Sequence, residues 1–253
     1  MKALSFILGG KTACFRKPDV NVFAYFTYNN IHKPVLLGLL GSIIGLGGYT
    51  QLFNKNKDVK KASLGYDDGY PEFYERLKDL KVSIIPRAEH GYFSKKIQTF
   101  NNSVGYASFE QGGNLVVREQ WLENPKWQIL ILDDESEVFQ KISDYLLNGK
   151  SVFIPYLGKN DHPAKIDEVK SVELLPFIKE QKVFSLFEED KLQIVKSPSR
   201  GELSYYFKEV SPIRLNLEHH FYEYTNLVFT NHKIEDENVE DVFSNEGNNY
   251  AFI

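Results

Sequence analysis

Residues 34–45 read PVLLGLLGSIIG, and this stretch without charges decides how the rest of the chain is arranged. The proline at its first position and Gly47-Gly48 after its end are typical of helix boundaries, so we predict a buried helix here. The uncharged run extends over residues 34–53, which is long enough to cross a membrane. It contains five glycines and several polar residues, however. This composition favours a helix packed closely on a sheet, and no membrane partner is expected.

The segments around this helix predict an α+β fold. Residues 3–8 alternate in polarity and lead into Gly9-Gly10, which indicates a first strand that ends in a turn. Further strands are predicted over residues 81–87, 115–121, 127–132 and 151–155, and further helices over residues 71–80 and 135–147. The order strand, helix, strand, strand, helix, strand is that of a ferredoxin-like (RRM-like) domain, an antiparallel sheet with helices on one face.

The pattern changes after about residue 166, where short aromatic-rich strands alternate with acidic turns. We therefore expect a ferredoxin-like domain over residues 1–166 and a smaller, all-β C-terminal region over residues 167–253. Residues 88–113 form a polar, glycine-containing excursion between two predicted strands. They are expected to be an insertion in the first domain.

Charge is distributed unevenly along the chain, although the formal net charge is only −4. Residues 1–166 carry 21 Lys and Arg against 17 Asp and Glu, whereas residues 167–253 carry 9 against 17. A polyanion responds to the local field, so the first domain is the candidate for binding nucleic acid. A solvated basic surface without a ligand is the alternative. The single cysteine, Cys14, suits a reducing compartment, and we expect a cytoplasmic protein without disulfides.

Several other chemistries lack their motifs. Gly10-Lys11-Thr12 resembles the end of a phosphate-binding loop, but the required upstream glycine is Ser5. The six histidines are dispersed or adjacent, without the spacing of metal ligands, and no Gly-x-Ser-x-Gly occurs. We therefore expect no metal and no cofactor.

Basic and aromatic residues are interleaved on the predicted loops that leave the sheet. Single-stranded RNA requires this combination, with cations for phosphates and flat rings for unstacked bases. The candidate residues fall at four places in the chain: Lys11, Arg16, Lys17, Tyr25, Tyr28, His32 and Lys33; then Arg87, His90, Tyr92, Lys95 and Lys96; then Arg118; then Tyr156 and Lys159.

Two stretches of the chain resemble the signatures of a known family. The first comprises Phe6-Ile7-Leu8-Gly9-Gly10, Ala13-x-Phe15-Arg16, Thr27-Tyr28 and the run from Lys33 to Gly45. The second is the run from Val152 to Ala164, VFIPYLGKNDHPA. Both resemble the fifth family of CRISPR-associated proteins, which are RAMP-superfamily subunits of the type I interference complex, Cascade. The whole chain, including its ending Tyr250-Ala251-Phe252-Ile253, is similar to the subtype I-B branch.

The resemblance implies a non-catalytic subunit in antiviral defence. Such subunits cap one end of the crRNA, hold its 5′ handle, and contact the backbone and large subunits, so that target DNA is a partner only indirectly. The family's β-hairpin thumb would correspond to residues 88–113, with Tyr92, Lys95 and Lys96 in its role. The family's C-terminal glycine-rich loop has no counterpart in residues 200–253.

An alternative function is metal-independent cleavage of CRISPR repeat RNA. Subtype I-C members of the family cut this RNA with a tyrosine, a lysine and a histidine. Tyr49, His90 and either Lys95 or Lys96 supply these residue types here. The chain has no adjacent Lys-His pair in this region. Subtype I-B systems usually leave cutting to a separate subunit, so the non-catalytic function is favoured.

Overall fold

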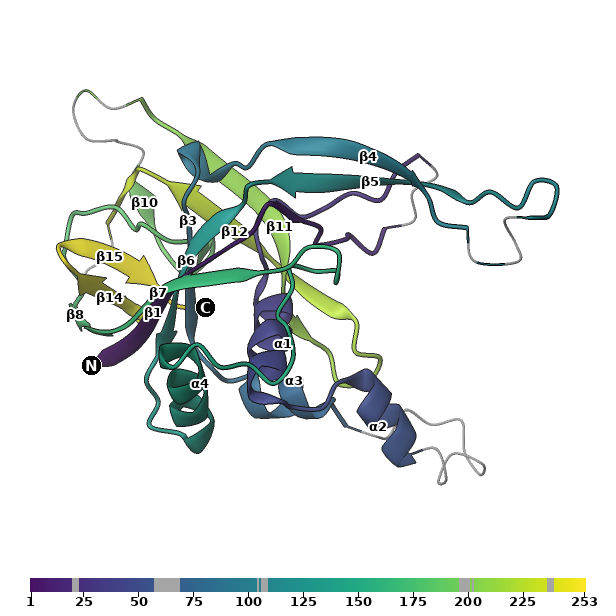
Figure 1. Cartoon of the computed structure of the whole chain (residues 1–253). Coiled ribbons are helices and arrows are strands. Elements are labelled where there is room, and N and C mark those ends of the chain that lie inside the picture. Colours follow the sequence, from purple (N-terminus) through teal and green to yellow (C-terminus); the bar gives the residue numbers. More distant parts are fainter. Residues whose placement is uncertain are drawn as a thin grey trace.

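Four antiparallel strands form the central sheet of the computed structural model, in the order β3-β6-β1-β7 (Figure 1). The structure describes residues 1–19, 23–56, 69–103, 105, 109–195, 201, 203–235 and 239–253. The strands are β1 (Lys2–Gly9), β3 (Val82–Pro86), β6 (Lys126–Leu132) and β7 (Lys165–Glu173). Helices α1 (Lys33–Ile44) and α4 (Glu137–Leu147) connect β1 to β3 and β6 to β7, respectively. The predicted mixed α+β class is confirmed.

Strand β1 lies at the centre of the sheet and is buried on both faces, which explains its nearly continuous apolar sequence. Successive side chains of a strand point to opposite faces, so its residues divide between two cores. Leu4, Phe6 and Leu8 join the core that contains the helices. Ala3 joins a smaller core on the other face, together with Phe252 near the C-terminus. The C-terminal residues therefore cover the face that a lone ferredoxin-like sheet would leave open.

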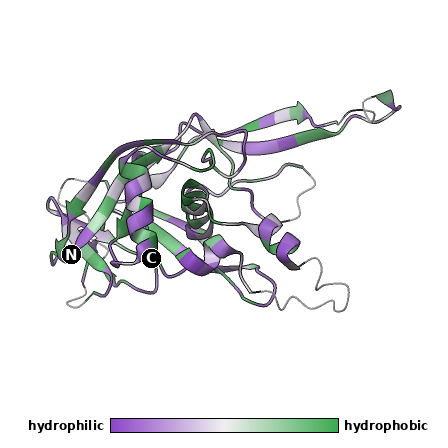
Figure 2. Cartoon of the chain, turned by 60° about the horizontal axis from the view of Figure 1, so that its bottom comes forward, coloured by the Kyte–Doolittle hydropathy of each residue, from purple (hydrophilic) through white to green (hydrophobic). Residues whose placement is uncertain are grey.

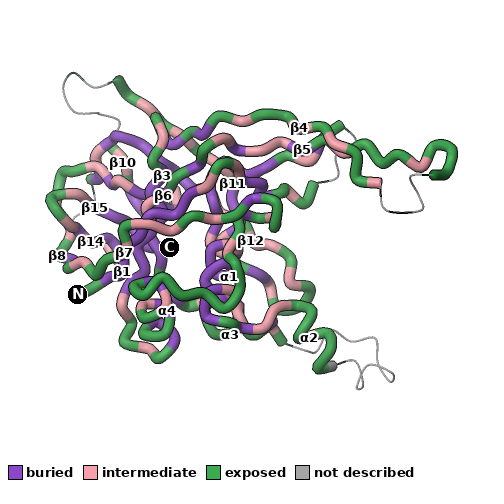
Figure 3. The backbone as a smooth tube through the Cα atoms, viewed as in Figure 1, coloured by how far each residue is buried: buried purple, intermediate pink, exposed green. Residues whose placement is uncertain are grey.

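Helix α1 is uncharged beyond its first residue because protein surrounds it. Its leucines and isoleucines are buried in a core that also contains Leu215 and Phe229 of the C-terminal region (Figure 3). A Cβ atom at Gly41 would lie 2.6 Å from Cβ of Phe73 in helix α3 (Glu72–Leu77), so glycine lets the two helices approach closely. The predicted buried helix is confirmed, with Gly45 in the left-handed conformation after its last turn.

No single helix in the described ranges is long and apolar enough to span a membrane. Helix α1 and the following helix α2 (Tyr49–Asn56) pass that test only as a pair, and they are bent by 71° relative to each other.

A long β-hairpin projects from the body of the protein (Figures 1 and 2). It consists of β4 (Lys95–Asn101) and β5 (Val116–Glu123), and the short strand β2 (Thr12–Ala13) pairs with the base of β5. The excursion predicted over residues 88–113 thus begins with a 3₁₀ turn, η1 (Glu89–Gly91), and contains β4. Exposed apolar residues such as Phe109, Leu115 and Val116 lie toward the far end of the hairpin.

The strand predicted over residues 151–155 is wrong. Residues 151–154 are exposed and irregular, and the backbone N–H groups of Val152 and Phe153 donate to the carbonyls of Ile43 and Ser42 at the end of α1. The segment therefore satisfies orphan carbonyl groups of a helix instead of pairing in the sheet. The fourth strand is β7, which has a largely polar sequence because it lies at the edge of the sheet. Strand β7 also crosses the predicted domain boundary at residue 166.

Strands are the regular elements in the described residues of the C-terminal region. Its long hairpin packs against α1, and two small sheets complete it. The strands are β8 (Leu175–Pro176), β9 (Phe187–Glu188), β10 (Ile194–Val195), β11 (Tyr206–Leu215), β12 (Tyr222–Thr230), β13 (Lys233–Ile234), β14 (Val242–Asn245) and β15 (Asn248–Ala251).

Replacing Gly158 by alanine should destabilise the fold strongly. Gly158 has a φ of +87°, and a Cβ atom there would lie 2.0 Å from the carbonyl oxygen of Cys14. The strained φ alone costs about 1–3 kcal/mol, and the clash with backbone adds to it. Gly149→Ala is the matched control, because Gly149 also has a positive φ but no atom within 4 Å of the added Cβ. Equal losses of unfolding free energy in urea for the two variants would contradict this packing.

Candidate nucleic-acid interface

A cleft of about 830 Å³ lies where three segments meet, and we call it the arm cleft. The segments are the arm (residues 14–19 and 23–32), the hairpin β4–β5 and the loop of residues 156–163. Its lining includes three cations and several aromatic rings: Phe15, Arg16, Phe23, Tyr25, Phe100, Arg118, Lys159 and Tyr222. The cleft therefore combines the two residue types that unpaired RNA requires.

Backbone hydrogen bonds fix the arm to the hairpin. Tyr25 N–H donates to the carbonyl of Arg118 over 2.9 Å, and Gln120 N–H donates to the carbonyl of Tyr25 over 2.8 Å. The arm also doubles back on itself, since Tyr28 N–H donates to the carbonyl of Phe15 over 2.9 Å. These bonds place the side chains of the arm and of β5 beside each other.

Two arginines in the cleft lie over aromatic rings. The guanidinium carbon of Arg16 is 3.3 Å from the centre of the Tyr25 ring, and that of Arg118 is 5.3 Å from the centre of the Phe23 ring. Both arginines are exposed, and neither forms an ion pair within the described part of the chain. A stacked guanidinium keeps its N–H edge available for a phosphate or a base edge.

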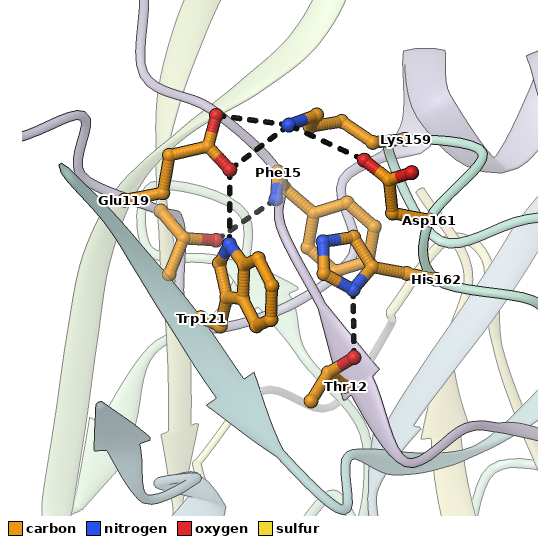
Figure 4. A network of polar contacts seen from close by, with 8 residues as sticks. Thr12, Phe15, Glu119, Trp121, Lys159, Asp161 and His162 are labelled. Atoms are coloured by element: carbon orange, nitrogen blue, oxygen red, sulfur yellow. Dashed lines mark hydrogen bonds and ion pairs between the residues drawn. The ribbon is translucent and has the colours of Figure 1, made fainter. Parts of the chain in front are cut away.

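The third cation, Lys159, is held by a buried carboxylate (Figure 4). Both oxygens of Glu119 lie 2.9 Å from Lys159 Nζ, and one of them accepts a hydrogen bond of 3.0 Å from the indole N–H of Trp121. Burial lowers the pKa of Lys159, but the hydrogen bond and attraction from Glu119, with Asp161, outweigh this and raise it overall. Lys159 therefore stays charged, yet most of its charge is compensated within the protein.

His162 completes this network below the cleft. Its Nδ1 is 2.7 Å from the hydroxyl of Thr12, and its ring contacts Trp121 edge-on at 4.7 Å between centres (Figure 4). Burial, and then the nearby Lys159 charge, lower the pKa of His162. The network thus joins the 156–163 loop to β2 and β5 and gives the cleft a rigid floor.

Two predicted contacts, Tyr28 and His32, are not on the surface. Their exposed fractions are 3% and 1%, and the His32 ring packs edge-on against Tyr28 and Tyr222. Burial lowers the pKa of His32 to about 3 and raises that of Tyr28. Both side chains support the cleft from behind, and direct contact with RNA by either is not compatible with this structure.

A second group of predicted residues lies around Glu209. Lys17 and Lys95 both interact with this carboxylate, which accepts hydrogen bonds of 2.8 and 3.1 Å from the Asn29 N–H. Lys95 also lies over the Tyr92 ring at 4.7 Å. Burial lowers the pKa of Lys95 and raises that of Glu209. The two lysines are therefore partly neutralised outside the arm cleft.

The remaining predicted residues are spread over other surfaces. Arg87, His90 and Tyr92 line a separate hollow, where the His90 ring packs on Tyr205 at 4.7 Å between centres. Lys33 lines a groove rich in acidic residues, and burial lowers its pKa despite attraction from Asp79. The last three do not line the arm cleft: Lys96 pairs with Glu123, and Lys11 and Tyr156 are exposed. Of the predicted set, the arm cleft collects Arg16, Tyr25, Arg118 and Lys159, with the buried His32 ring in its wall.

The lining residues missed from the sequence include Phe23, Phe100, Glu119 and Tyr222. Glu119 is the one acidic residue in the run VVREQW, which could have indicated a buried partner for a lysine. Tyr222 belongs to the acidic C-terminal region, and the packing of the β11–β12 hairpin against α1 and His32 brings it to the cleft.

Neither a metal site nor an activated thiol accompanies the cleft. No group of three or more His, Cys, Asp or Glu residues in the described ranges could hold a metal ion. Cys14 lines the cleft, but burial, followed by the Glu119 charge, raises the pKa of its thiol to about 11. The thiol is therefore protonated at neutral pH.

Solved structures similar to this chain include some whose titles name CRISPR proteins. No protein-family description and no curated protein matches the chain. Several solved structures match the chain at low sequence identity. A "CRISPR RNA-guided surveillance complex" chain is 14% identical, with a TM-score of 0.48 over 92% of this chain and 91% of that one. A "CRISPR protein from Archaeoglobus fulgidus" is 10% identical, with a TM-score of 0.44 over 99% and 98%.

A third similar structure is a chain of the "Type III-B Cmr-beta bound to cognate target RNA and AMPPnP", 12% identical, with a TM-score of 0.44 over 92% of this chain and 86% of that one. The resemblance to CRISPR-associated proteins stated from the sequence thus agrees with the titles of these structures. Because all three TM-scores are below 0.5, the functional argument below rests on this chain's own residues.

Removing the Lys159 charge should destabilise the protein, because it leaves Glu119 buried without its partner. Breaking a fully buried pair costs about 3–5 kcal/mol. Lys159 is 31% exposed, so we expect a smaller loss, about 1–3 kcal/mol, for Lys159→Met. The double variant Glu119→Gln/Lys159→Met should lose less unfolding free energy than Lys159→Met alone, because it leaves no buried charge without a partner. A double-mutant cycle of urea unfolding measures the coupling, and additive losses would contradict a coupled pair.

His32 should make stability dependent on pH. Its pKa is about 3 in the folded protein and 6.5 ordinarily, so between these values the unfolded chain binds a proton that the folded chain does not. Stability therefore falls as the pH drops below about 6.5, by about 2 kcal/mol at pH 5 from this residue. The slope of unfolding free energy against pH should be shallower in His32→Gln and His32→Leu. An unchanged slope in both, or the same change in the exposed-site control His90→Gln, would contradict this account.

Proposed function

We propose that this chain is an RNA-binding subunit of a CRISPR effector complex that grips single-stranded RNA in the arm cleft. The observation that carries the proposal is the convergence of Arg16 and Arg118, each over a ring, on one cleft with further aromatic rings. Guanidinium groups contact phosphates and rings stack with unpaired bases, so the cleft has both halves of the required chemistry.

The more specific assignment, to a protein family, rests on the two sequence stretches at residues 6–45 and 152–164. We propose a ferredoxin-like RAMP domain of the fifth family of CRISPR-associated proteins, most similar to subtype I-B. The hairpin β4–β5 is then the thumb, and the RNA is the 5′ handle of the crRNA. The backbone and large Cascade subunits would be the protein partners, and target DNA would be reached indirectly.

We also propose that this subunit does not cut RNA. The residue types suggested for cleavage lie in different surroundings: Tyr49 packs against Phe73 and His220, whereas His90 packs against Tyr205. This separation supports a binding role. Incubating the purified protein with repeat RNA in EDTA tests it, and a specific cut that disappears in Tyr49→Phe would establish the endoribonuclease instead.

Reversing the charge of an arginine in the cleft should weaken RNA binding and its salt dependence. Each phosphate contact contributes about −0.7 to the slope of log K against log salt for single strands. We expect Arg118→Glu and Arg16→Glu each to lower affinity at low salt and to flatten that slope by about this amount. Fluorescence anisotropy of labelled single-stranded RNA over a salt series measures both quantities.

Arg76→Glu is the matched control, because Arg76 is an exposed arginine on α3 paired only with Glu72 at 4.0 Å. The same change of charge there should leave affinity and slope close to wild type. Equal effects of all three variants would show that net charge alone governs binding, which would contradict a defined interface in the arm cleft.

A further inference from the structure

A second cleft, of about 570 Å³, lies between helix α2 and the turn that joins β11 to β12, and we call it the α2 cleft. Its lining is mostly aromatic and, among the described residues, contains no lysine or arginine: Pro34, Tyr49, Leu52, Phe53, Phe73, Leu215, His219, His220, Phe221 and Tyr222. Several of these rings are well exposed, with Phe221 67% and Tyr49 47% accessible. The described lining therefore offers flat apolar faces and no cation for a phosphate.

The α2 cleft adjoins the arm cleft. Tyr222 lines both clefts, and consecutive residues at the start of α1 are divided between them, Pro34 in the α2 cleft and Val35 in the arm cleft. The edge-on contact of Tyr222 with buried His32, at 5.1 Å between centres, fixes the tyrosine in this position. A strand that follows the arm cleft past Tyr222 would thus arrive at the α2 cleft.

One polar atom in the α2 cleft lining lacks a partner. The Nε2 atom of His220 is buried and has no hydrogen-bond partner among the described residues. The His220 ring also contacts the rings of Tyr49 and Tyr70, at 5.6 and 5.3 Å between centres. A buried polar atom without a partner is costly, but this atom has almost no accessible surface and is not presented to a ligand in the open cleft.

From these observations we propose that the α2 cleft binds one unstacked nucleobase of the RNA whose backbone lies in the arm cleft. The proposal rests on the proposed function. A base has two apolar faces for the rings, whereas its phosphate remains outside among the cations of the arm cleft. Continuity through Tyr222 favours a nucleotide of the bound RNA over an aromatic side chain of a protein partner.

The test compares single-stranded RNAs that lengthen by one nucleotide at a time. For Phe221→Ala, RNAs confined to the arm cleft should bind as they do to wild type, whereas RNAs that reach the α2 cleft should bind about five-fold or more weakly, the lower end of the loss of one base–ring stack. Leu217→Ala is the matched control, because Leu217 is 59% exposed in the same turn but does not line the cleft.

A single abasic nucleotide moved along the longest RNA identifies the base. At one position, the abasic substitution should lower the affinity for wild type as much as Phe221→Ala lowers the affinity for the intact RNA. Combining the abasic RNA with Phe221→Ala should cause no further loss. Photocrosslinking of iodouridine at that position should label residues of the α2 cleft.

Unchanged affinity for the longest RNA in both Phe221→Ala and Tyr49→Ala would overturn the inference, and is the result expected if a protein side chain fills the cleft. Short RNAs that bind wild type and lose affinity in Arg118→Glu would still support the proposed function in that case. Failure of every RNA to bind wild type would instead reject the proposed function itself.

Discussion

The burial of most of helix α1 is the constraint on which the rest of the structure depends. A helix with apolar residues on all sides must be covered on all sides, and the sheet alone covers only one. Strands β11 and β12, together with α3, cover the remainder, so that Leu215 and Phe229 belong to the same core as the leucines of α1. The two halves of the sequence are therefore joined through this helix, although their charges are opposite in sign.

This constraint also positions both clefts. The start of α1 lies between them, since Pro34 lines one cleft and Val35 the other. The hairpin β11–β12 that covers the helix brings Tyr222 to the same place. A tyrosine from the acidic C-terminal region thus takes part in a surface that is otherwise built from the basic N-terminal domain.

Elements with a strong apolar pattern could be predicted from the sequence, and elements defined by tertiary contacts could not. The helix α1 and the strands β1, β3 and β6 were found because burial on both faces leaves long apolar runs. Strand β7 was missed because an edge strand with one solvated face has a polar sequence, KIDEVKSVE. Residues 151–155 were assigned to a strand because they are apolar, but their backbone caps α1 instead.

The candidate site was predicted less completely, because a sequence shows cations but not the carboxylates that neutralise them. Glu119 compensates Lys159, and Glu209 lies beside both Lys17 and Lys95, from positions that are distant in the chain. Likewise, the sequence predicts that the rings of Tyr28 and His32 contact RNA, but both side chains pack inward. What could be predicted was the combination of rings and cations on the arm. Which of its members face a ligand depends on the backbone pairing of Tyr25 with β5.

The neutralisation of nearby lysines by carboxylates limits the kind of binding that the arm cleft can support. Two arginines stacked on rings remain available there, whereas the lysines nearby are largely paired within the protein. Binding would then release few counterions and depend mainly on stacking, which is far less sensitive to salt than phosphate contacts are. A protein that slides along a polyanion needs the opposite balance, a dense and uncompensated positive surface. On the proposed function, the arm cleft would therefore hold unpaired bases mainly by stacking on its rings, because few of its cations remain uncompensated.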